Sequence, residues 1–160
     1  MKKILTLLLF AAVALCACDP GFNDEYYLKN TLSYNIKYAE MNPHTGTIRE
    51  VITVRPGASE RVWTFSGIDM SCFESESNPY TAFCQRDVVP VIIFPGEVQD
   101  LSLAWAIDDF FNFEKHPKYK HCWSILQSEA NRHRSSHRVE YRVDETDYEN
   151  AYIQHYANGR

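Results

Sequence analysis

Hydrophobic and polar residues alternate with a period of two along several segments of this chain. Apolar residues occupy every second position of 34–38 and of 138–143, so one face of each segment is expected to be buried in a sheet. Residues typical of turns separate these segments from further expected strands at 26–30, 47–54, 60–65, 88–94 and 98–105. Strands joined by short turns predict an all-β fold, an Ig-like or related antiparallel β-sandwich of about seven strands.

The period changes near the C-terminus. Tyr148, Tyr152 and Tyr156 recur every four residues, as side chains on one face of a helix do. Thr146 and Glu149 have the spacing of a capping box. The sequence therefore predicts a short C-terminal helix after the last strand.

Other segments lack a clear period. We expect loops at 66–87, 107–120 and 131–137, where turn-forming and charged residues are frequent. The segment 121–127 fits either a strand or a short helix.

An apolar run of the kind that directs export opens the chain. Lys2 and Lys3 precede the run, which is too short for a helix that spans a membrane and remains there. The run ends in a sequence that fits a lipobox, with Cys18 as the modified cysteine. Modification of Cys16 would instead place bulky Leu15 where signal peptidases require a small residue. We therefore expect a lipoprotein signal peptide at 1–17, a lipid-anchored tether at 18–25 and a single β-sandwich domain at 26–160.

The charge balance limits the kinds of partner. Removal of the signal takes two lysines with it, so a net charge of −5 becomes −7. An acidic domain is a poor match for nucleic acid. It is also repelled by anionic membrane surfaces, so the lipid on Cys18 has to attach the chain to the membrane. The expected location is the cell envelope, and the outer membrane is favoured. The sequence does not decide between the periplasmic and the outer face of that membrane.

Short motifs mark the two ends of the exported chain. A strand of the form Tyr-x-Leu-x-Asn lies at 26–30, and Thr-Asp-Tyr follows an aromatic strand within 145–151. Together with the lipobox, these motifs resemble those of small secreted lipoproteins of Bacteroides-type bacteria. The resemblance covers both ends of the domain and implies a compact β-sandwich with no catalytic residues to carry over.

Three cysteines remain in the domain after export and modification. Cys72 and Cys84 flank a turn-rich segment, and we expect a disulfide between them in the oxidising envelope. Closing a loop of that length contributes roughly 3 kcal/mol to stability. Two reduced thiols, or a bridge from Cys122 to one of the pair, are the alternatives.

A group of histidines is the candidate for metal binding or nucleophilic chemistry. The group comprises His116, His121, His133 and His137, together with Cys122. On a strand, a spacing of four residues separates two side chains by roughly 13 Å, too far for one ion. A polar, solvated loop is the simpler interpretation, and no metal or other cofactor is expected.

Arginines and tryptophans each have a functional and a structural interpretation. The arginines suit an anion site, but nearby acidic residues are expected to neutralise them: Arg132, Arg134, Arg138 and Arg142. The tryptophans suit a stacking platform for a glycan, but their positions favour the core: Trp63, Trp105 and Trp123.

These observations predict a lipid-anchored envelope protein with a binding or structural role, in contact with protein or glycan, and no catalytic activity. One alternative is a small envelope hydrolase or metal-binding protein that uses the region of His121, Cys122, His133 and His137. A second alternative is a pilin-like or assembly subunit that pairs through an edge strand.

Overall fold

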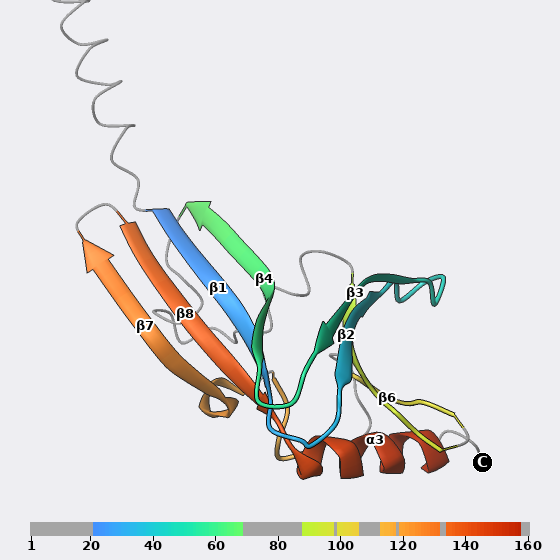
Figure 1. Ribbon diagram of the computed structural model, residues 1–160. Coiled ribbons are helices and arrows are strands. Elements are labelled where there is room, and N and C mark those ends of the chain that lie inside the picture. The colour runs from blue at the N-terminus through green and yellow to red at the C-terminus, as the bar shows by residue number, and fades with distance from the viewer. Residues whose placement is uncertain are drawn as a thin grey trace, which may run out of the picture.

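A computed structural model describes residues 21–68, 88–97, 99–105, 113–117, 119–131 and 134–157 of the chain. The described residues form two four-stranded sheets, a short 3₁₀ turn and one helix at the C-terminal end (Figure 1). This arrangement confirms the all-β sandwich with a C-terminal helix that the alternating pattern predicts.

The eight described strands divide equally between the sheets. Sheet A has the order β4-β1-β8-β7, with β1 (Gly21–Asn30), β4 (Ser59–Ile68), β7 (Trp123–Asn131) and β8 (Arg134–Val143). Sheet B has the order β3-β2-β5-β6, with β2 (Ile36–Met41), β3 (Ile48–Val54), β5 (Val89–Phe94) and β6 (Leu101–Ala104). The 3₁₀ turn η1 (Lys120–Cys122) precedes β7, and helix α3 (Glu145–Ala157) follows β8.

The two central strands of sheet A come from opposite ends of the chain. β1 and β8 run parallel and in register, from Gly21 opposite Arg134 to Asn30 opposite Val143. The other strand pairs among the described residues are antiparallel. A parallel pair requires a long connection, and here the chain between β1 and β8 builds the remaining strands. The sandwich therefore has a parallel pair at the centre of an otherwise antiparallel architecture.

β1 begins at Gly21 and not at Tyr26, so residues 21–25 belong to sheet A and not to a tether. Phe22 and Asp24 both point into the sandwich, with 6% and 0% of their surface exposed. Polar and glycine residues in this segment resemble a linker in composition, which conceals the period of two. The buried aspartate is compatible with a strand because His137 lies opposite it on β8.

Aromatic residues from both sheets fill the core. Trp63, Trp105 and Trp123 are each at most 7% exposed. The ring centroids of Trp105 and Trp123 lie 5.0 Å and 5.5 Å from that of Tyr141, with edge-on geometry that favours aromatic pairs. The core interpretation of the tryptophans is confirmed, and their rings are not accessible for stacking on a glycan.

Asn30 is the last residue of β1, and its side chain holds the segment that connects β1 to sheet B by hydrogen bonds to backbone groups. Its buried amide donates to the carbonyl oxygens of Tyr34 and Val54, at 2.7 Å and 2.9 Å. Its Oδ1 accepts a hydrogen bond from the Leu32 amide at 3.0 Å. These three bonds satisfy both ends of a buried amide. The asparagine that closes the Tyr-x-Leu-x-Asn motif therefore has a structural role.

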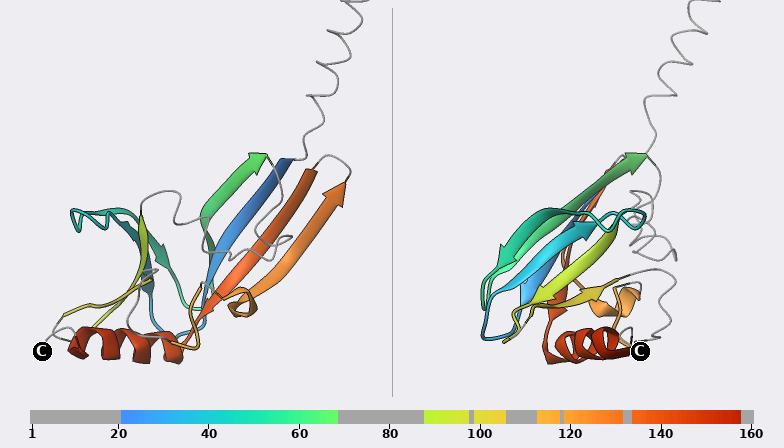
Figure 2. Two further views of the ribbon diagram at one scale, coloured as in Figure 1. Left: turned by 180° about the vertical axis from the view of Figure 1, so that it is seen from behind. Right: turned by 90° about the vertical axis from the view of Figure 1, so that its right-hand side faces the viewer.

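The two sheets lie close together where β1 passes into β2, and they splay apart towards the start of β1 (Figures 1 and 2). Helix α3 lies at the closed end of the sandwich and packs beside β6. The start of β1 and helix α3 therefore occupy opposite ends of sheet A. Within the described ranges, no helix is long and apolar enough to cross a membrane.

Candidate functional site

Helix α3 is capped by Asp144 and not by Thr146. Asp144 Oδ1 accepts a hydrogen bond from the Thr146 amide at 3.0 Å, and Asp147 Oδ2 accepts one from the Asp144 amide at 3.0 Å. This is a reciprocal capping box built from two aspartates. The predicted box of Thr146 and Glu149 is wrong, because Asp144 and Asp147 provide the same spacing two residues earlier.

The face of α3 that lies against the sheets is polar or small. It comprises Asp147, Asn150, Ala151 and Gln154, each at most 8% exposed. Gln154 reaches the edge of β6, where its Oε1 accepts from the Ala104 amide at 3.0 Å and its Nε2 donates to the Ala104 carbonyl at 3.1 Å. The side-chain amide thus pairs with β6 as a neighbouring strand would, and it covers part of the sheet edge.

The opposite face of α3 is exposed and carries Tyr152, Ile153 and Tyr156 beside the charged residues Glu145 and Glu149. Tyr152, Ile153 and Tyr156 are 50%, 48% and 57% exposed. The rings of the two tyrosines lie 4.3 Å apart between centroids and are tilted by 43°. Tyr148, the first of the tyrosine row, is half-buried and packs edge-on against Phe94. A surface helix normally turns its apolar residues inward, so these exposed rings make this face of α3 a candidate contact surface.

A groove of about 260 Å³ runs between the tyrosine row and the segment that leads into β6. We call it the tyrosine groove; it is lined by Gly96, Glu97, Gln99, Leu101, Tyr148, Tyr152, His155 and Tyr156. Gln99 Nε2 lies 2.7 Å from His155 Nε2 and donates to it, so that ring nitrogen acts as an acceptor. Apolar rings with a few polar side chains are typical of ligand sites.

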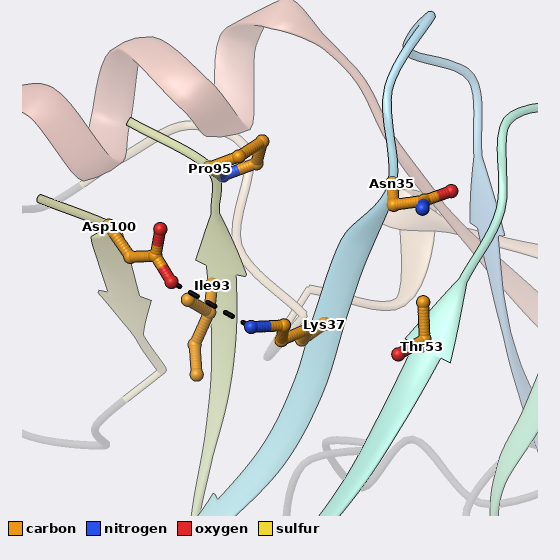
Figure 3. A pocket seen from close by; sticks show the side chains of 6 residues that line it. All are labelled: Asn35, Lys37, Thr53, Ile93, Pro95 and Asp100. Atoms are coloured by element: carbon orange, nitrogen blue, oxygen red, sulfur yellow. Dashed lines mark ion pairs between the residues drawn. The ribbon is translucent and has the colours of Figure 1, made fainter. Parts of the chain in front are cut away.

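A second groove, of about 410 Å³, lies on the outer face of sheet B (Figure 3). It is lined by Asn35, Lys37, Thr53, Ile93, Pro95 and Asp100. Lys37 Nζ and Asp100 Oδ2 lie 3.8 Å apart across it, and both side chains are about half exposed. Such an exposed pair contributes at most about 1 kcal/mol. Its lining combines Ile93 and Pro95 with polar and charged side chains, and it has none of the aromatic rings that line the tyrosine groove.

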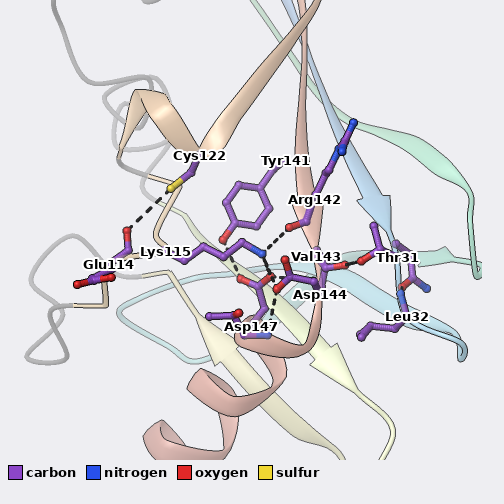
Figure 4. A network of polar contacts seen from close by, with 12 residues as sticks. Thr31, Leu32, Glu114, Lys115, Cys122, Tyr141, Arg142, Val143, Asp144 and Asp147 are labelled. Atoms are coloured by element: carbon purple, nitrogen blue, oxygen red, sulfur yellow. Dashed lines mark hydrogen bonds and ion pairs between the residues drawn. The ribbon is translucent and has the colours of Figure 1, made fainter.

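A polar network joins the start of α3 to β8 and to Lys115 (Figure 4). Lys115 Nζ lies 2.8 Å from Asp144 Oδ1 and also pairs with Asp147 Oδ2, and it donates to the Arg142 carbonyl at 2.7 Å. The Tyr141 hydroxyl donates to Asp147 Oδ1 at 2.7 Å. Burial raises the pKa of Asp147, although Lys115 and the hydrogen-bond donors act in the opposite direction. The charge on Asp147 is therefore costly, and these donors offset part of that cost.

Burial also keeps the Tyr141 hydroxyl and the Cys122 thiol in this region in their protonated forms. Burial raises the pKa of Tyr141, and the neighbouring Asp147 adds to the effect, so the hydroxyl keeps its proton and donates. Burial likewise raises the pKa of the Cys122 thiol. A thiol that resists ionisation is a weak nucleophile, which weakens the hydrolase alternative.

Among the described residues, the group considered for metal or nucleophilic chemistry is divided between the region of η1, with His116, His121 and Cys122, and β8, with His137. His121 is exposed in η1 and stacks on Tyr119, with ring centroids 5.4 Å apart. Cys122 is a free thiol at the end of the same turn. His137 lies opposite Ser128, well along β7 from this turn. Within the described ranges, no three His, Cys, Asp or Glu side chains are placed to hold a metal ion. His133 is outside the described residues, and His116 is buried.

His137 instead forms a buried pair with Asp24 between the sheets. Its Nδ1 lies 3.0 Å from Asp24 Oδ1, and the two residues are 5% and 0% exposed. The prediction of a loop at 131–137 is therefore wrong from Arg134 onward, where β8 begins. Asp24 was missed because polar residues at inward positions give no apolar period, and its partner lies far away in the sequence.

Two of the three described arginines of β8 pair with carboxylates, but only Arg142 pairs with an acidic residue near it in the sequence, as predicted. Arg138 Nη2 lies 3.1 Å from Glu25 Oε2, and Arg61 of β4 reaches the other oxygen of the same carboxylate at 3.1 Å. Burial alone would raise the pKa of Glu25, but the hydrogen bonds from Arg138 and Arg61 outweigh it and lower the pKa. Arg142 pairs with Glu140. The acid that neutralises Arg138 lies on β1, far from it in sequence.

Several predicted positions lie outside the described residues. These are Cys18, Cys72, Cys84 and Arg132. The lipid attachment and the Cys72–Cys84 disulfide therefore stay predictions.

The comparisons with known proteins give no relative from which a role could be transferred. No protein-family model matches the chain, and no curated protein or solved structure matches it either. The tyrosine groove is therefore identified from the geometry of this chain alone.

Proposed function

We propose that this chain is a lipid-anchored protein of the bacterial cell envelope that binds a protein partner through the tyrosine groove of α3. The lipobox and the apolar run before it support the anchor at Cys18. The acidic domain supports attachment through lipid and not through its own surface charge.

The reversed polarity of α3 is the observation that carries the binding role. Polar Asp147, Asn150 and Gln154 face the sheets, whereas Tyr152 and Tyr156 face outward. Tyrosine is frequent at protein interfaces because it buries a large ring and keeps a hydroxyl for hydrogen bonding. Exposed side chains of this size give α3 little stability in the isolated domain, and a partner that buried them would gain their hydrophobic contribution.

A protein partner fits the groove better than a glycan. The rings of Tyr152 and Tyr156 are tilted by 43° and do not form one flat platform for a sugar ring. Ile153, also exposed, adds aliphatic surface beside them. Glu97 and His155 supply a carboxylate and an imidazole at the rim, which suit hydrogen bonds to a peptide backbone.

The anchor is tested by metabolic labelling with a fatty acid. The wild-type chain is expected to take up label, whereas Cys18→Ala is expected to stay unlabelled and unprocessed. Cys16→Ala is the matched control, because it removes the neighbouring cysteine and leaves Cys18 in place. Label on the Cys18→Ala protein would contradict lipid attachment at this residue.

Binding is tested by a photo-crosslinking amino acid placed at Tyr152 in living cells. We expect one discrete adduct that is sensitive to protease. Arg49, exposed on β3 and outside the groove lining, is the control position. The same adducts from both positions, or none from 152, would argue against a binding groove. An adduct that resists protease and is lost on glycosidase treatment would identify a glycan partner instead.

A second candidate is assembly through β7. This nine-residue edge strand exposes Ile125 and Leu126, at 54% and 49%. Exposed apolar side chains on an edge strand favour pairing with another chain. However, the register shifts between Ile125 and Gln127, and such an irregularity interrupts the ladder that a new strand would extend. Light scattering across a range of protein concentrations distinguishes assembly, which raises the mass, from a monomer.

A further inference from the structure

Very little chain separates the proposed lipid from the sandwich. β1 begins at Gly21, three residues after Cys18. Three residues span at most about 11 Å even when fully extended. A lipid on Cys18 would therefore hold the start of β1 within that distance of the lipid attachment point.

All four strands of sheet A reach the same end as the start of β1. Gly21 lies opposite Ile68, the last residue of β4, and opposite Arg134, the first residue of β8. Arg134 in turn lies opposite Asn131, the last residue of β7. We call this the open end of sheet A; it is at the top of Figure 1.

We propose that the open end of sheet A rests on the bilayer surface and that Arg134 contacts lipid phosphates there. This inference depends on the lipid anchor of the proposed function. Arg134 is exposed, and within the described part of the chain its side chain has no carboxylate partner. Arg138 and Arg142 of the same strand do have such partners, in Glu25 and Glu140.

The chemistry of Arg134 suits a phosphate surface. A guanidinium donates paired hydrogen bonds to phosphate oxygens. A basic side chain near an anionic bilayer contributes about 1 kcal/mol, roughly a fivefold change in an equilibrium. The acidic domain as a whole is repelled by an anionic bilayer. A positive charge at the end nearest the lipid reduces this repulsion locally and favours the approach of this end to the headgroups.

The same orientation places the tyrosine groove away from the membrane. β1 and β8 each run for ten residues from the open end, about 33 Å at the usual rise of a strand. Helix α3 begins directly after β8, at the far end of sheet A (Figure 2). The bilayer would therefore leave the groove open to a partner.

The test uses the lipidated protein in nanodiscs that contain phosphatidylglycerol and a small share of a gadolinium-chelating lipid. Paramagnetic attenuation of backbone amide signals reports which residues are near the headgroups. We expect the signals of Gly21 and Arg134 to be attenuated several-fold more than that of Ile153. Equal attenuation, or stronger attenuation at Ile153, overturns the orientation.

Two matched variants test the role of Arg134. In Arg134→Gln, the ratio of attenuation at Gly21 to that at Ile153 is expected to fall by about twofold or more, because one phosphate contact is lost. Arg142→Gln removes the same charge from the α3 end of the same strand and is expected to leave the ratio unchanged. An unchanged ratio in Arg134→Gln overturns the phosphate contact.

Intact mass separates this inference from the anchor on which it depends. A protein that carries acyl chains on Cys18 but shows uniform attenuation overturns the orientation and leaves the anchor standing. A protein without acyl chains overturns both.

Discussion

Replacing Asp147 by alanine tests whether hydrogen bonds, more than apolar burial, hold α3 against the sandwich. The substitution removes the acceptor of the Tyr141 hydroxyl and of the Asp144 amide. It also leaves Lys115 with Asp144 as its remaining carboxylate among the described residues. Tyr141 is fully buried, so its hydroxyl gains no water in exchange.

The expected loss follows from these contacts. A buried hydroxyl without an acceptor costs about 1–3 kcal/mol. Loss of a capping acceptor costs about 1 kcal/mol. Together they predict that Asp147→Ala lowers the free energy of unfolding by about 2–4 kcal/mol, a large share of the stability of a typical domain.

Urea unfolding followed by tryptophan fluorescence measures this loss, because the three buried tryptophans report on the core. Asp144→Ala is the matched control: its side chain is 45% exposed, and its loss is expected to cost about 1 kcal/mol. Tyr141→Phe combined with Asp147→Ala should cost less than the sum of the single variants, by about 1–2 kcal/mol. Equal losses for the two aspartates, or strict additivity with Tyr141→Phe, would refute the reasoning.

Replacing Gln154 by alanine leaves the backbone groups of Ala104 on β6 without their partner, and the free energy of unfolding is expected to fall by about 1–3 kcal/mol in the same urea assay; no change would show that the helix does not cover this edge. The pKa of Glu25 is lowered in the folded state. Its contribution to the free energy of unfolding is therefore present above the pKa of the unfolded chain and is lost as pH falls through the pKa of the folded protein. Between about pH 5 and pH 3 the wild type should therefore lose more stability than Glu25→Gln, and parallel curves would contradict this. Alkylation of the denatured, unreduced protein should modify one thiol among Cys72, Cys84 and Cys122, as read by intact mass; three modified thiols would rule out the predicted disulfide.

Strands whose inward residues are apolar could be predicted from the sequence. Ile36 and Tyr38 of β2 and Val139, Tyr141 and Val143 of β8 are all buried, as their period of two indicates. The beginnings of β1 and β8 could not be predicted in this way. Several of their inward positions are occupied by polar residues, and two of these, Asp24 and His137, form a pair across the parallel strands. Such a pairing is a long-range property, and no local pattern reveals it.

The helix illustrates the same limit at the candidate site. The spacing of Tyr148, Tyr152 and Tyr156 predicts α3, but an apolar row on a helix is expected to face the core. The orientation is set instead by Gln154 and Asp147, whose partners lie on β6 and β8. A sequence-based argument finds the helix from its period, whereas the exposure of the tyrosines depends on contacts with distant strands.

The contacts that hold α3 in place and the surface proposed for binding lie on different faces of the helix, and this separation strengthens the proposal. Hydrogen bonds are directional, so the inward polar face fixes the position of the helix without requiring apolar burial. The exposed rings of Tyr152 and Tyr156 are therefore not needed to fold the domain. They lie on α3, which starts where β8 ends and then extends along β6 of sheet B, far from the start of β1 and from the proposed lipid (Figure 1). If a helix with exposed apolar residues lay beside the proposed lipid, those residues would suggest insertion into the membrane. Because α3 lies far from the proposed lipid, its exposed rings favour contact with another protein.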